Sequence, residues 1–164
     1  MSAQRIATFF GVGHLRPAPG TWGSLAALPV ALVLHWLGGF WLLSAATVVV
    51  FLVGWWATAR ATEGKDDHDP SEIVIDEVAG QWLALWALSW PATQHDLAIT
   101  ALWPGWIAAF VLFRLFDIWK HGPIGWADRR GDALGVMLDD IVAGLFAGVC
   151  VMVLAGLYHG ILGL

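Results

Sequence analysis

The chain has 164 residues, of which 59% are hydrophobic and only 13% are charged. A soluble domain is about half apolar and about a quarter charged, so this composition excludes an ordinary soluble protein and predicts one membrane-embedded domain over residues 1–164. The 13 acids and 8 Lys and Arg residues give a net charge of −5, which excludes a basic nucleic-acid-binding surface. A single cysteine, Cys150, leaves no disulfide framework and no cysteine zinc set.

Five apolar stretches predict an all-α, polytopic membrane bundle with about five spans. They cover Leu25–Gly38, Phe40–Ala59, Val78–Trp90, Leu97–Ile118 and Ile141–Leu164. The second, fourth and fifth stretches reach the roughly 20 residues that a span needs. The first and third are short, so we expect each to be extended by a polar helical start.

The third helix is predicted to begin in the segment Asp69-Pro70-Ser71-Glu72. In this interpretation Asp69 is the N-cap, Pro70 is the first helical residue and Glu72 completes a capping box. The helix would then run from Pro70 to Trp90, and Glu72 and Asp76 would share one of its faces because they are four residues apart.

The basic residues predict the orientation of the spans. They lie before the first span, between the second and third, and between the fourth and fifth, at Arg5, Arg16, Arg60, Lys65, Lys120, Arg129 and Arg130. The connections on the other side contain no Lys or Arg. The positive-inside rule therefore places the N-terminus in the cytoplasm and the C-terminus on the opposite side.

Most of the acids lie on the same predicted cytoplasmic face. Asp76 and Glu77 directly precede one apolar helix, and Asp139 and Asp140 directly precede another. Adjacent carboxylates where a helix enters the membrane repel each other and lose hydration, so they indicate a functional site. Oxygen ligands without His or Cys favour Mg²⁺ over zinc. The alternative is that helix N-termini simply favour acids.

Two further features complete the predicted site. Asp117 follows Arg114 by three residues at the cytoplasmic end of the fourth span, where the two can form an ion pair or belong to the site. The Gly- and Pro-rich segment 11–24 leads into a helix and offers backbone N–H groups, Arg16 and Thr21 to an anion. A plain turn at the membrane surface is the alternative for this segment.

Other phosphatase signatures are absent, including the Asp-x-Asp-x-Thr/Val motif of haloacid dehalogenases, the Cys-x5-Arg loop and the histidine-dependent lipid phosphatase motifs. Four ordered blocks, Gly13–Ala26, Ile73–Gly80, Phe113–Lys120 and Gly135–Gly144, resemble the phosphatidylglycerophosphatase A family. The resemblance implies an all-helical fold in the bacterial inner membrane. It also implies Mg²⁺-dependent removal of the terminal phosphate from the phospholipid phosphatidylglycerophosphate, which yields phosphatidylglycerol.

Our hypothesis for the mechanism is metal-assisted hydrolysis, in which the metal activates a water and polarises a phosphoryl oxygen. Another carboxylate accepts the proton of the water, and an attacking Asp is a variant of this scheme. The expected metal ligands are Asp76, Glu77, Asp117, Asp139 and Asp140. The expected catalytic carboxylates are Glu72, Asp76, Asp128 and Asp139. The expected phosphate-binding residues are His14, Arg16, Thr21, Lys120 and Arg129.

Two other functional classes are compatible with a small polytopic protein. A carboxylate-lined cation transporter is the main alternative, but its acids should lie near the middle of the membrane. The predicted acids lie at the ends of the spans instead. A structural membrane subunit is the second alternative, and it gives no reason for paired acids.

Overall fold

The computed structural model of the chain describes residues 2–65, 67 and 69–162. Within these residues the protein is all-helical and has no β-strand, which confirms the all-α part of the predicted fold class. The elements are α1 (Ser2–Ala7), the 3-10 helix η1 (Phe9–His14), α2 (Pro19–Ala61), α3 (Ile75–Gln94), the 3-10 helix η2 (Ile99–Leu102), α4 (Trp103–Trp119), α5 (Pro123–Asp128) and α6 (Ala133–Leu162).

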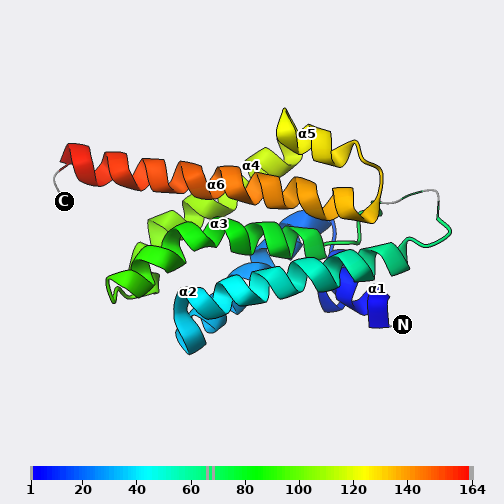
Figure 1. Cartoon of the computed structure of the whole chain (residues 1–164), viewed down its shortest axis with the longest axis horizontal. Coiled ribbons are helices and arrows are strands. Elements are labelled where there is room, and N and C mark those ends of the chain that lie inside the picture. Colours follow the sequence, from blue (N-terminus) through cyan, green and yellow to red (C-terminus); the bar gives the residue numbers. More distant parts are fainter. Residues whose placement is uncertain (1, 66, 68, 163–164) are drawn as a thin grey trace.

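Helix α2 is a hairpin of two arms. Its helical geometry breaks at Gly38 and Gly39, and Gly39 adopts φ 60° and ψ −152°, a conformation that is essentially restricted to glycine. The Thr93 hydroxyl on α3 accepts a hydrogen bond from the Phe40 N–H at 2.9 Å, which anchors the turn. Figure 1 shows the second arm returning alongside the first. The two arms correspond to the first two predicted spans.

Three helical segments of the described residues are long and apolar enough to cross a membrane, namely Pro19–Ala61, Ile99–Trp119 and Ala133–Gly160. Large apolar side chains project outward from them; Leu37, for example, is 74% exposed and Ile118 is 70% exposed. Exposed apolar surface of this extent fits contact with lipid. The chain is therefore a helical membrane protein, while the count of five spans stays a prediction.

Helices α3 and α6 run side by side in the same direction (Figure 1). Small residues allow their backbones to approach closely, as is common between membrane helices. A Cβ added to Gly144 would lie 2.2 Å from the carbonyl oxygen of Gly80, and a Cβ added to Gly80 would lie 2.5 Å from the carbonyl oxygen of Asp140. This contact fixes the register of the two helices.

The predicted start of the third helix is wrong. Helix α3 begins at Ile75 with Val74 as its N-cap. The Val74 N–H donates to the carbonyl oxygen of Ala7 at 2.9 Å, and a Cβ added to Gly13 would lie 1.9 Å from the carbonyl oxygen of Glu72. The N-terminal elements therefore hold this segment outside the helix. Glu72 belongs to no capping box and shares no helix face with Asp76.

Helix α6 begins at Ala133, eight residues before the predicted span at Ile141. Asp132 acts as its N-cap, because its side-chain Oδ1 accepts the Gly135 N–H at 2.7 Å. Its backbone carbonyl accepts the Val136 N–H at 3.1 Å. Asp139 and Asp140 consequently lie about two turns inside the helix rather than at its start.

Candidate active site

A cavity of about 320 Å³ with many charged lining residues lies where α2 and α3 begin and α4 ends, beside the second turn of α6. Every residue predicted to bind metal lines it. Its ionisable lining residues are Asp69, Asp76, Glu77, Asp117, Asp139, Asp140, Arg114 and Lys120. Residues Ala18, Pro19 and Gly20 bring the N-terminal turn of α2 to the cavity, and the first backbone N–H groups of a helix have no intrahelical partner. The cavity thus combines carboxylates with groups that bind anions.

The close contact of α3 and α6 explains why acids from two helices meet. Asp76 lies one helical turn before Gly80 on α3, and Asp140 lies one turn before Gly144 on α6. Residues four apart share a helix face. Since the two glycines touch and the helices run parallel, the two carboxylates are placed side by side at the same end.

Asp76, Glu77 and Asp140 form the acidic cluster. They offer carboxylate oxygens that all lie within 4.8 Å of one another. Asp76 is 6% exposed and Asp140 is 2% exposed. Among the described residues, Oδ1 of Asp76, Oε2 of Glu77 and Oδ2 of Asp140 are buried without a hydrogen-bond partner. Buried carboxylates without partners are costly. The acidic cluster therefore fits a bound cation, and three oxygen donors suit a hard divalent metal.

Arg114 lies beside this cluster as a largely buried cation. Its guanidinium forms an ion pair with Asp117 on the same helix and lies 3.8 Å from Oε1 of Glu77. A Cβ added to Gly20 would lie 2.1 Å from that Glu77 oxygen and 3.1 Å from the Arg114 guanidinium. A side chain at position 20 would therefore displace the Glu77 carboxylate, and glycine lets the start of α2 approach the two charges.

Lys120 is the second cation that lines the cavity. Its ammonium lies 2.6 Å from Oδ1 of Asp128 and 2.8 Å from Oδ2 of Asp139. Burial lowers the pKa of Lys120, but Asp139 and Asp128 outweigh that effect and raise the pKa above its ordinary value. Lys120 consequently stays positively charged at neutral pH.

The remaining predicted residues lie at or beyond the rim. Arg16 donates a hydrogen bond of 3.1 Å to Oγ of Ser71, which lines the cavity. His14 and Arg129 are exposed, while Thr21 and Glu72 are half-buried, and none of these four lines the cavity. Their roles stay predictions.

Sequence reasoning missed the place of three residues, Asp69, Ser71 and Arg114, in the cavity wall. The sequence predicts a helix cap for Asp69, and for the pair of Arg114 and Asp117 it leaves an ion pair and a role in the site as alternatives. One signal could have identified Arg114, because a charged residue within an apolar span is costly and usually faces a functional interior. The sequence offers no comparable signal for Ser71.

The family model of phosphatidylglycerophosphatase A matches residues 5–155. A phosphatidylglycerophosphatase A of Haemophilus influenzae is 36% identical over 147 residues, which cover 89% of this chain and 84% of the relative. This chain belongs to the phosphatidylglycerophosphatase A family. The phosphatidylglycerophosphatase A of Escherichia coli is 37% identical over 145 residues, which cover 87% of this chain and 77% of that relative. No solved structure matches the chain significantly.

The four blocks that resemble the phosphatidylglycerophosphatase A family all reach the cavity. The first contributes the start of α2, the second contributes Asp76 and Glu77, the third contributes Arg114 to Lys120, and the fourth contributes Asp139 and Asp140. Four blocks that are far apart in the sequence thus line one cavity, which is the candidate active site.

Proposed function

We propose that this chain removes the terminal phosphate of phosphatidylglycerophosphate by hydrolysis and releases phosphatidylglycerol and inorganic phosphate. The observation that carries the proposal is the group of three buried, unpartnered carboxylate oxygens of Asp76, Glu77 and Asp140. They lie in the cavity that all four family blocks line. The names of the Haemophilus influenzae and Escherichia coli relatives supply the substrate, and the donor chemistry of the cavity supports metal-assisted hydrolysis.

Asp76, Glu77 and Asp140 would hold Mg²⁺, whose oxygen preference they match. The chemistry that Mg²⁺ supplies when bound is polarisation of a phosphoryl oxygen and a lowered pKa for a water. Arg114, Lys120 and the N-terminal turn of α2 would bind the phosphate and neutralise the charge that develops on it.

A carboxylate outside the acidic cluster would accept the proton of the attacking water. Glu72 and Asp128 were the predicted candidates. Asp69 lines the cavity, whereas Glu72 does not, and Asp128 is engaged by Lys120 at 2.6 Å. These contacts favour Asp69 for the role.

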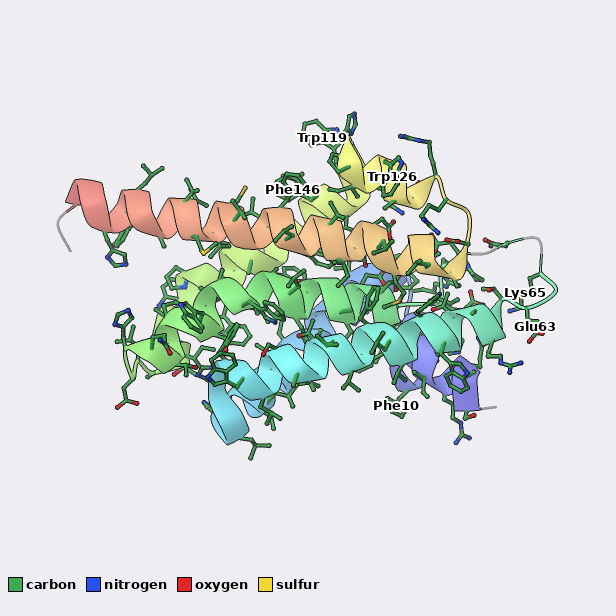
Figure 2. All side chains as sticks on the ribbon, viewed as in Figure 1. Phe10, Glu63, Lys65, Trp119, Trp126 and Phe146 are labelled. Carbon is green, nitrogen blue, oxygen red and sulfur yellow. The ribbon has the colours of Figure 1, made fainter. Side chains whose placement is uncertain are left out.

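We further propose that the chain forms one domain that crosses the bacterial inner membrane five times. The five spans would be the first arm of α2, the second arm of α2, α3, α4 and α6. The N-terminus and the cavity would lie on the cytoplasmic side. The basic residues at the cavity end support this orientation. Exposed tryptophans near both ends of the helices support interfacial belts, and Trp119 and Trp126 lie on the outer side of the bundle around α5 (Figure 2). The headgroup would then reach the cavity while the acyl chains stay in lipid.

Phosphate release from phosphatidylglycerophosphate in detergent micelles, measured with Mg²⁺ and with EDTA, tests the proposal. We expect release with Mg²⁺ and none with EDTA, and loss of release in Asp140→Asn. Glu63→Gln is the control, because it also replaces a carboxylate with its amide but should keep phosphate release. Glu63 lies in the connection after α2 (Figure 2), and its side chain is 69% exposed. Release that persists in EDTA would refute the metal-dependent mechanism, and no release at all would favour another class, such as a transporter.

A further inference from the structure

Asp139 and Asp140 are neighbours in sequence but are bonded in different ways. Oδ1 of Asp139 accepts the backbone N–H of Asp140 at 2.9 Å, and its Oδ2 accepts the Lys120 ammonium at 2.8 Å. Both oxygens of Asp139 therefore already have protein donors. Oδ2 of Asp140, in contrast, is buried without a partner among the described residues. Of the two, Asp140 is the one that lacks a counter-charge.

The corner between α4 and α5 holds Lys120 in place. Lys120 ends α4 in the left-handed conformation, with φ 38° and ψ 46°, which is uncommon for a residue other than glycine. A Cβ added to Gly125 would lie 2.3 Å from the carbonyl oxygen of Lys120, so α5 packs directly on its backbone. Asp128, at the end of α5, then reaches the ammonium at 2.6 Å.

Two carboxylates from different helices thus fix the position of one ammonium group. A lysine ammonium carries three donor hydrogens. Asp139 and Asp128 accept two hydrogen bonds from it. The third donor has no acceptor among the described residues, and the side chain that carries it lines the same cavity as the acidic cluster. A phosphoryl oxygen is the natural acceptor for this third donor.

We propose that Asp139 and Asp128 are positioning residues that hold Lys120 toward the phosphate, and that Asp139, unlike Asp140, is not a ligand of the metal. The inference rests on the proposed phosphatase function. It assigns Asp139 a role different from the metal-binding role that its place beside Asp140 in the sequence predicted. It also gives the two neighbouring acids of α6 different roles, with Asp140 in the metal-binding cluster and Asp139 in support of the phosphate-binding Lys120.

The test compares Mn²⁺ binding to the full-length protein in detergent, followed by electron paramagnetic resonance of free Mn²⁺. We expect Asp140→Asn to weaken Mn²⁺ binding at least tenfold. Asp139→Asn should change it less than threefold, as should the control Glu63→Gln. In parallel, Asp139→Asn and Asp128→Asn should raise KM for phosphatidylglycerophosphate more than they lower kcat, and Lys120→Arg should retain more activity than Lys120→Met.

Equal weakening of Mn²⁺ binding by Asp139→Asn and Asp140→Asn would overturn the inference. If Asp139→Asn does not fold because Lys120 loses one of its two carboxylate partners, the double variant Lys120→Met/Asp139→Asn removes both charges and gives the same comparison. The binding comparison needs no turnover. If the variants show the expected differences in Mn²⁺ binding but the wild-type protein does not hydrolyse phosphatidylglycerophosphate, the proposed function is refuted. The inference that Asp139 is not a metal ligand would still stand.

Discussion

The contact between α3 and α6 makes a sharp prediction for Gly144→Ala. The added Cβ would lie 2.2 Å from the carbonyl oxygen of Gly80, and ordinary contact starts at 3.4 Å, so the two backbones must separate by about 1.2 Å. Overpacking of this kind destabilises a protein by about 1–3 kcal/mol. The separation occurs one turn from Asp76 and Asp140. Because a misplacement of about 1 Å can lower a rate about 100-fold, we expect a loss of that size in kcat/KM.

Gly148→Ala is the matched control, one turn later on α6. There the added Cβ would lie 3.4 Å from the carbonyl oxygen of Ala84, which is ordinary contact. Both substitutions gain about 1 kcal/mol of helix propensity, so the difference between them isolates the clash. The assay is phosphate release from phosphatidylglycerophosphate, with thermal unfolding in detergent as the measure of folding. A folded Gly144→Ala variant with the activity of Gly148→Ala would refute the proposed packing of the site.

Three further predictions follow from single contacts. Gly20→Ala places a Cβ 2.1 Å from Oε1 of Glu77, so phosphate release should fall at least tenfold with a nearly unchanged melting temperature, and wild-type release would contradict this geometry. Arg114→Lys keeps the charge but loses the forked guanidinium that reaches both Glu77 and Asp117, so the KM for phosphatidylglycerophosphate should rise more than twofold. A KM within twofold of wild type would argue against phosphate binding by Arg114. Gly39→Ala, at φ 60° and ψ −152°, should lower stability by about 1–3 kcal/mol in thermal unfolding without changing Mn²⁺ affinity, and an unchanged melting temperature would exclude strain at this turn.

The sequence predicted the fold class and the carboxylates of the cavity for a physical reason. Charges in an apolar chain lose hydration unless they share a site, so adjacent acids on two helices indicate where those helices meet. The structure brings Asp76, Glu77 and Asp140 together as expected. The break of α2 at Gly38 and Gly39 also corresponds to the predicted boundary between the first two spans.

The helix starts could not be predicted because tertiary contacts decide them. The segment beginning at Asp69 has the residues of a capping box, but the bond between Val74 and Ala7 holds its end outside the helix. Local propensity is a weak guide where a distant backbone group competes. The different roles of Asp139 and Asp140 were equally hidden, since they depend on a tertiary contact of Asp139 with Lys120 at the end of α4.

The central claim is that Asp76, Glu77 and Asp140 hold the divalent metal. Anomalous X-ray diffraction from crystals of the full-length protein soaked in Mn²⁺ tests it most directly, because the anomalous signal locates the ion without reference to activity. We predict a peak within coordination distance of oxygens from all three carboxylates, with Asp139 still paired with Lys120. A peak elsewhere in the protein with none at these three carboxylates would contradict the claim.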